Sequence, residues 1–127
     1  MYIDLLTKIK NAQAVKKEIA KSAYSKMDER ILEILLSKGY ISGFEKKGKG
    51  AKRVFDIHLK YEKNNGGAIT GIKFVSKPSR KMYIGYKDIR PIKSGYGFMV
   101  ISTPDGVLAG GEARREKVGG ELLFEIW

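Results

Sequence analysis

Residues 101–127 read ISTPDGVLAGGEARREKVGGELLFEIW. Two apolar runs in this stretch, GVLAG and ELLFEIW, are bounded by turn residues, a pattern typical of short buried strands. The charged segment EARREK lies between two glycine pairs and predicts one short helix. The Pro-Asp-Gly triplet predicts a tight turn. So many glycines and hydroxyls beside strands indicate a surface that presents backbone and short side chains to a closely approaching ligand.

The preceding residues continue this β pattern toward the middle of the chain. Short strands are predicted in AITGIKFVS, KMYIGYK and GFMVIS, where helical periodicity is almost absent. The segment EKNNGG, at residues 62–67, is the expected soft connection. We therefore predict an N-terminal domain at residues 1–65 and a β-rich C-terminal domain at residues 66–127.

The N-terminal part mixes helices and strands. Residues 3–17 predict an amphipathic helix, because apolar side chains recur on one side at a spacing of 3.6 residues. A strand is predicted in EIAKSAY. Ser25 predicts the N-cap of a second helix, with Asp28 as its capping-box partner, and Gly39 is expected to end that helix. Its broad buried face is predicted to hold Met27, Ile31, Leu32, Ile34, Leu35 and Leu36.

From Tyr40 onward the apolar period changes to two. Residues 41–47 and 54–61 predict a hairpin in which Asp56 and His58 alternate with core side chains. The predicted fold class is therefore α+β. An N-terminal α/β lobe of two helices and a small sheet would pack against a mostly β C-terminal lobe with one short helix.

Charge favours a polyanionic partner. The chain has 25 Lys and Arg against 14 Asp and Glu, a formal net charge of +11, and the excess is present in both halves. A solvated basic surface without a specific partner is the alternative. No segment resembles a signal peptide or a membrane span, so we expect a cytoplasmic protein.

Other function classes lack their sequence signals. The chain has no cysteine and one histidine, His58, without co-ligands, so no metal site or cofactor is predicted. Its aspartates are scattered singly, which argues against an enzyme acting on nucleic acid. A peripheral membrane protein would need exposed bulky residues opposite the lysines of an amphipathic helix, and the first helix does not offer them.

Several blocks together carry a resemblance to a known family. They are LTKIKNA, LLSKGYISGF, VSKPSRKMYIG, GYGFMVISTPDGVLAGGEAR and VGGELLFEIW. In this order, over essentially the whole length, the chain resembles the bacterial form of the eighth protein of the small ribosomal subunit. One departure lies in the turn, where Pro104 and Asp105 stand in place of the family's usual Ser and Lys. A hydroxyl and a cation are therefore missing from the region that the family uses against RNA.

The resemblance implies a structural, non-enzymatic protein of the ribosome. It would bind the central domain of small-subunit ribosomal RNA directly, support the folding of that domain and subunit assembly, and contact neighbouring small-subunit proteins. An RNA-binding translational repressor acting on messenger RNA is the alternative function.

The hydroxyl-bearing turn is the first predicted RNA contact, through Ser102, Thr103, Pro104 and Gly106. Ser102 and Thr103 supply donors and acceptors for ribose hydroxyls, and Gly106 would let the turn beside Pro104 lie close to a ribose. A plain hairpin turn is the alternative.

The next predicted RNA contacts belong to the same lobe and are Lys81, Tyr83, Gly120 and Glu121. Tyr83, beside Lys81, is interleaved with basic residues, and the resemblance implies that it faces RNA. Glu121, after Gly120, would accept a hydrogen bond from a base amino group; the alternative is an ion pair with Arg114 or Arg115.

On the N-terminal lobe, the polar side of the first helix suits phosphate and sugar contacts, with a solvated helix face as the alternative. Its predicted contacts are Thr7, Lys8, Lys10 and Asn11. The basic hairpin tip KKGKGAKR, at residues 46–53, either reaches another RNA segment or is mobile.

Overall fold

A computed structural model describes residues 2–61, 66–92 and 97–127. The chain forms two compact units, Met1–Ala68 and Ile69–Trp127. The predicted soft connection lies mostly outside the described residues. No helix in the described part of the chain is long and apolar enough to cross a membrane.

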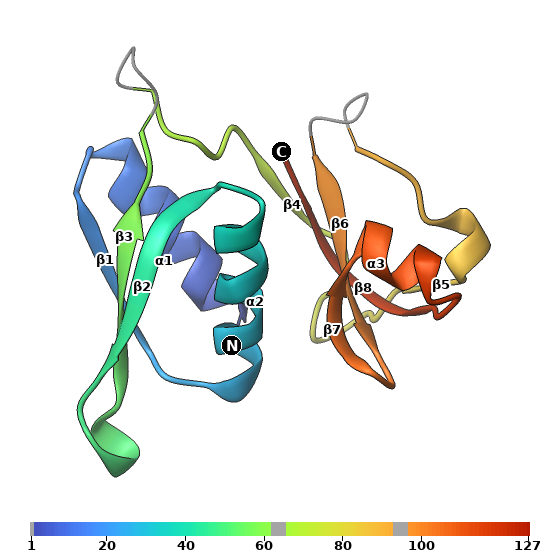
Figure 1. Ribbon diagram of the computed structural model, residues 1–127, viewed down its shortest axis with the longest axis horizontal. Coiled ribbons are helices and arrows are strands. Elements are labelled where there is room, and N and C mark those ends of the chain that lie inside the picture. Colours follow the sequence, from blue (N-terminus) through green and yellow to red (C-terminus); the bar gives the residue numbers. More distant parts are fainter. Residues whose placement is uncertain (1, 62–65, 93–96) are drawn as a thin grey trace. The chain divides into compact units, whose positions relative to one another are not determined.

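The first unit packs two helices on a three-stranded antiparallel sheet (Figure 1). Helix α1 contacts β1 and β3, and α2 contacts β2. The strand order is β1-β3-β2, which leaves β1 and β2 as edges. The elements are α1 (Tyr2–Ala14), β1 (Ile19–Ala23), α2 (Lys26–Ser37), β2 (Ile41–Lys47), η1 (Gly50–Lys52) and β3 (Val54–Leu59).

The caps of α2 confirm the predicted helix boundaries. The Ser25 hydroxyl accepts a hydrogen bond from the Asp28 backbone N–H at 3.0 Å, as an N-cap does. At the other end Gly39 has a φ of +80°, and the N–H of Tyr40 donates to the Leu35 carbonyl. This is a Schellman ending, for which glycine is the usual residue.

Two predictions in this unit were wrong. Helix α1 ends at Ala14 rather than at residue 17, because Lys16 has a left-handed φ of 58° and turns the chain out of the helix. Leu36 is 41% exposed and lies off the buried face of α2. Asp56, which was expected to alternate with core residues, is only 5% exposed and pairs with Lys47 at 2.8 Å.

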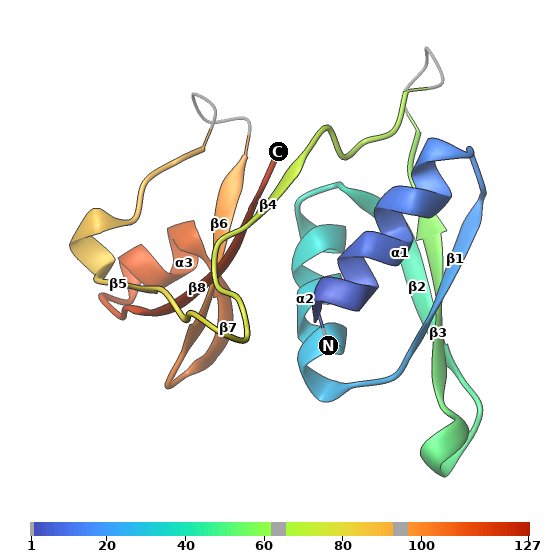
Figure 2. The same ribbon diagram turned by 180° about the vertical axis from the view of Figure 1, so that it is seen from behind.

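The second unit is a five-stranded antiparallel sheet covered by one short helix, as predicted (Figure 2). The strand order is β4-β8-β6-β7, and β5 pairs with β8 beyond the end of β4. Helix α3 contacts β6 and β7, and Ala113 of α3 joins a core cluster with Ile101, Leu108 and Leu122. The elements are β4 (Ile72–Phe74), β5 (Tyr83–Ile84), η2 (Tyr86–Asp88), β6 (Phe98–Thr103), β7 (Gly106–Ala109), α3 (Gly110–Arg115) and β8 (Gly120–Ile126).

Candidate nucleic-acid interface

Three predicted contacts form one row across the second sheet. Tyr83 of β5 is paired with Glu121 of β8, and Glu121 is paired with Ser102 of β6. Directly opposed residues of an antiparallel ladder point to the same face. Because Ile101 and Leu122 alternate with Ser102 and Glu121 and belong to the core under α3, this row faces away from the helix. We call Tyr83, Glu121 and Ser102 the polar row.

The groups of the polar row are available to a ligand. Tyr83 is 72% exposed, and Ser102 and Glu121 are partly exposed. Within the described residues, the Glu121 carboxylate and the Ser102 hydroxyl have no hydrogen-bond or ion-pair partner. Arg114, the predicted alternative partner of Glu121, instead donates to the Ile89 carbonyl at 3.3 Å. The row thus joins an aromatic ring, an acceptor and a hydroxyl on one surface.

Thr103 differs from Ser102 because its hydroxyl belongs to the β6–β7 turn. It donates to the Gly106 carbonyl at 2.7 Å and accepts from the Asp105 N–H at 3.1 Å. Thr103 is only 9% exposed, and its single hydroxyl proton is already used. The hydroxyl pair of the sequence is therefore divided: Ser102 faces outward and Thr103 braces the turn.

Two predicted glycines have distinct structural reasons. Gly106 has a φ of +107°, and the space where a Cβ would lie is open, so the turn can approach a ligand closely. Gly120 lies where β8 passes next to β6, and a Cβ there would collide with the Ser102 carbonyl oxygen. Pro104, exposed at the first corner of the turn, fixes φ for that corner.

The loop before Tyr83 is held by a buried serine. The hydroxyl of Ser76, which is 1% exposed, donates to the Leu122 carbonyl at 2.7 Å and accepts from the Met82 N–H at 3.0 Å. Lys77 and Arg80 close the loop with two reciprocal backbone hydrogen bonds of 2.9 Å. This loop carries the predicted contact Lys81, which is exposed.

A small groove lies beside this loop, in a region that sequence reasoning did not assign to the interface. Its volume is about 250 Å³, and its lining combines three cations with three apolar side chains. The basic spacing of KPSRK was the signal that could have indicated it. The lining residues are Lys73, Phe74, Val75, Lys77, Arg80 and Met82.

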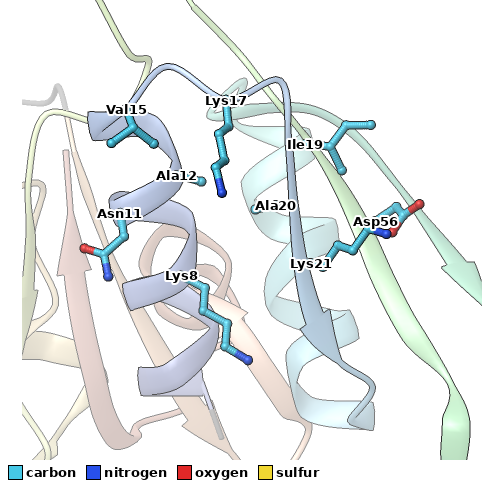
Figure 3. A pocket seen from close by; sticks show the side chains of 9 residues that line it. All are labelled: Lys8, Asn11, Ala12, Val15, Lys17, Ile19, Ala20, Lys21 and Asp56. Atoms are coloured by element: carbon cyan, nitrogen blue, oxygen red, sulfur yellow. The ribbon is translucent and has the colours of Figure 1, made fainter.

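A larger groove lies in the first unit, between α1 and the edge strand β1 (Figure 3). Its volume is about 760 Å³. The predicted residues Lys8 and Asn11 line it, and Lys17 and Lys21, which were not predicted, line it as well. Figure 3 shows the Lys8 and Lys17 side chains extending into the space between helix and strand. Its apolar lining consists of Ala12, Val15, Ile19 and Ala20.

The other predicted residues of α1 lie outside this groove. Thr7 is exposed, and its hydroxyl donates to the Ile3 carbonyl at 2.7 Å. Lys10 is exposed on the same helix. Asp56 also lines the groove, where the hydrogen-bonded Lys47 ammonium, and more weakly Lys21, lower the pKa of its carboxyl. The groove therefore has an excess of positive charge.

Comparison with known proteins identifies the family. The family model for Ribosomal protein S8 matches residues 2–127. A small ribosomal subunit protein uS8 from Nautilia profundicola is 43% identical over 124 residues, covering 98% of this chain and 95% of the relative. The uS8 protein of Thermus aquaticus is 40% identical over 131 residues, with the same coverage of each chain. The chain therefore belongs to the ribosomal protein S8 family, whose members are structural, non-enzymatic components of the ribosome.

Proposed function

We propose that this protein is a structural component of the small ribosomal subunit that binds the central domain of small-subunit ribosomal RNA directly. In this role it supports the folding of that domain and subunit assembly, beside neighbouring small-subunit proteins. The ribosomal setting is supported by the family and by relatives named as small-subunit proteins. The observation that carries direct RNA binding is the polar row, whose three groups share one face and lack partners within the described chain.

The polar row suits irregular RNA. An unpaired base can stack on the exposed Tyr83 ring, an interaction worth about 1–3 kcal/mol. Glu121 can accept a hydrogen bond from a base amino group, which explains an unpaired carboxylate on a basic protein. The Ser102 hydroxyl can bond to a ribose 2′-hydroxyl. Base identity is then read by Glu121, whereas Tyr83 stacks on a base of any identity and Ser102 contacts the sugar.

The turn contributes shape rather than extra donors. Thr103 and Pro104 hold the turn rigid, and Gly106 leaves its outer side open, so ribose can reach the backbone. Gly120 allows β6 and β8 to lie close enough to align Ser102 with Glu121. Pre-organisation of this kind lowers the entropic cost of binding.

Contacts with phosphates complete the interface. Lys81, on the loop held by Ser76, lies two positions before Tyr83 in the chain and suits the phosphate of a stacked nucleotide. On α1, Lys8 and Asn11 in the groove, together with Thr7 and Lys10 outside it, suit phosphate and sugar contacts. Such contacts position a protein on RNA without reading sequence.

Crosslinking in cell extract followed by sequencing of the bound RNA tests this proposal. We expect reads from the central domain of small-subunit ribosomal RNA to dominate, and a transcript of that domain to bind the purified protein. Reads dominated by messenger RNA would instead support the repressor function. A Tyr83→Ala, Glu121→Gln double variant is the matched control, and it should lose these crosslinks while remaining folded.

A further inference from the structure

The hairpin tip, residues 46–53, contains a hydrogen-bonded turn. Between β2 and β3 the backbone forms the single turn η1, in which Lys52 N–H donates to the Lys49 carbonyl at 3.1 Å. Gly48 has a φ of +88°, and a Cβ there would press on the Lys52 carbonyl oxygen at 2.6 Å. The tight turn therefore depends on this glycine, and it sets the backbone positions of the lysines beside it.

Three of the five cations in the hairpin tip anchor it to the first unit. Lys46 pairs with Glu29 at 2.9 Å, and Lys47 pairs with Asp56 at 2.8 Å. The Arg53 guanidinium lies 4.0 Å from the centre of the Tyr24 ring, a cation–π geometry. These cations have internal partners that account for their presence.

The remaining two cations, Lys49 and Lys52, have no such partner. Both are exposed, and neither ammonium has an ion pair or hydrogen bond within the described residues. The hairpin extends past the ends of α1 and α2, so its tip is not covered by the helices of its own unit (Figure 1). Two like charges three residues apart repel each other, and an anionic ligand would relieve that repulsion.

The chemistry of the tip selects its ligand. Between Gly48 and Lys52 the largest apolar side chain is that of Ala51, so the tip lacks the aromatic or aliphatic anchors of a protein interface. It offers two lysines, and at Gly50 the space around the Cα is open, so a ligand can reach the backbone. This combination fits a string of phosphates.

We propose that the hairpin tip binds the sugar–phosphate backbone of a second RNA segment, distinct from the segment that contacts the polar row. This inference rests on the proposed function, since it requires that the protein binds RNA. Lys49 and Lys52 contact phosphates, and Lys46, Lys47 and Arg53 hold the turn in place. The tip fixes position and does not read sequence. Binding at both units would join two parts of the RNA through one protein.

Site-directed radical probing tests the proposal directly, because the chain has no cysteine that would compete for the label. The variants Ala51→Cys, at the tip, and Asp105→Cys, beside the polar row, each carry a tethered iron chelate that cleaves nearby RNA. A Glu33→Cys variant on α2 gives the background. We expect both probes to cut the central-domain transcript above that background, at nucleotides separated in the RNA secondary structure.

The outcomes separate the two proposals. Cleavage from position 105 without cleavage from position 51 overturns the hairpin-tip proposal and leaves the proposed function intact. Cleavage of the same nucleotides by both probes also overturns the second segment. If neither probe cuts the RNA, the proposed function itself fails.

Charge removal gives an independent readout. In Lys49→Ala, Lys52→Ala the slope of log affinity against log salt should fall by about 0.7–0.9 for each lost phosphate contact. Lys26→Ala removes an exposed lysine of the same unit and should leave the slope unchanged. An unchanged slope in the double variant overturns the proposal. The same unchanged slope with poorer incorporation into subunits would assign the tip to an acidic protein partner instead.

Discussion

Tyr83 lies directly opposite Glu121 in the β5–β8 ladder, although 38 positions separate them in the chain. Strand β8 then carries the row on to Ser102 of β6. An exposed ring, a carboxylate without a partner in the described chain and a free hydroxyl are thus set at neighbouring positions by backbone hydrogen bonds. The spacing of these groups depends on strand register and not on flexible side chains alone.

Tyr83→Ala tests the stacking role. The ring is 72% exposed, so the free energy of unfolding should change little, whereas RNA affinity should fall. Loss of one stacked base, about 1–3 kcal/mol, corresponds to about a 5- to 150-fold weaker Kd by calorimetric titration. Tyr83→Phe, which keeps the ring, should retain most of the affinity. Equal losses in both variants would show that the phenol hydroxyl, and not stacking, carries the contact.

Ser102 and Thr103 should respond differently to removal of the hydroxyl. Thr103→Ala loses two turn hydrogen bonds, and we expect the free energy of unfolding to fall by about 1–2 kcal/mol in urea titration. Ser102→Ala should leave stability unchanged and weaken RNA binding by about 1 kcal/mol, about fivefold. Thr103→Ser, which keeps the hydroxyl, is the control for the turn. A stable Thr103→Ala protein with weakened binding would return Thr103 to a direct RNA contact.

Gly120→Ala should force apart the backbones of β6 and β8, which hold Ser102 and Glu121 of the polar row. The added methyl collides with the Ser102 backbone, which cannot rotate away, so we expect a loss of at least about 1–3 kcal/mol of stability. Gly111→Ala in α3 is the matched control, because nothing lies within 4 Å of its added methyl. That change should be neutral or stabilise by up to about 1 kcal/mol. Thermal unfolding of both variants provides the comparison, and equal midpoints would contradict the packing argument.

The lysines of α1 should affect salt dependence. If Lys8 contacts a phosphate from the groove, Lys8→Ala lowers the slope of log affinity against log salt by about 0.7–0.9. Lys10→Ala should do the same from outside the groove, and Lys26→Ala provides the control. A slope that stays constant in Lys8→Ala would show that the groove does not hold RNA backbone.

Local pattern predicted the elements well, because the signals were local. Helix α2 begins after Ser25 and ends before Gly39, and the hydrogen bonds at these two ends join residues at most five positions apart. The end of α1 was missed because Lys16 takes a left-handed conformation in which glycine is expected. The ion pair of the buried Asp56 with Lys47 on the neighbouring strand is a further feature that alternation along one strand does not report.

The arrangement of the candidate site could not be predicted from local sequence, because it depends on tertiary contacts. Ser102 and Thr103 are adjacent in sequence. The Ser102 hydroxyl lies on the exposed face beside Glu121, whereas the Thr103 hydroxyl is hydrogen-bonded within the turn. The alternative for Glu121 was an ion pair with Arg114 or Arg115; among the described residues Glu121 pairs with neither, and Arg114 donates to the Ile89 carbonyl. The α1–β1 groove joins Lys8 to Lys17 and Lys21 through helix–strand packing, which no spacing in the chain indicated.

The contribution of Asp28 to stability should decrease as the pH rises. Burial raises the pKa of this carboxyl above its ordinary value, and the hydrogen bond with Ser25 opposes that shift only partly. The folded state therefore disfavours the ionised form, so the contribution of Asp28 to stability is fully present below the unfolded pKa and is lost as pH rises through the folded pKa.

Asp28→Asn keeps an uncharged side chain at every pH. The variant should therefore gain stability over the parent protein, and this gain in the free energy of unfolding should be larger at pH 7 than at pH 3. Urea titration at both pH values measures it. The difference at pH 3 is the internal control, because the parent carboxyl is then largely protonated in the folded state. An identical difference at both pH values would show that the pKa of Asp28 is not raised in the folded protein.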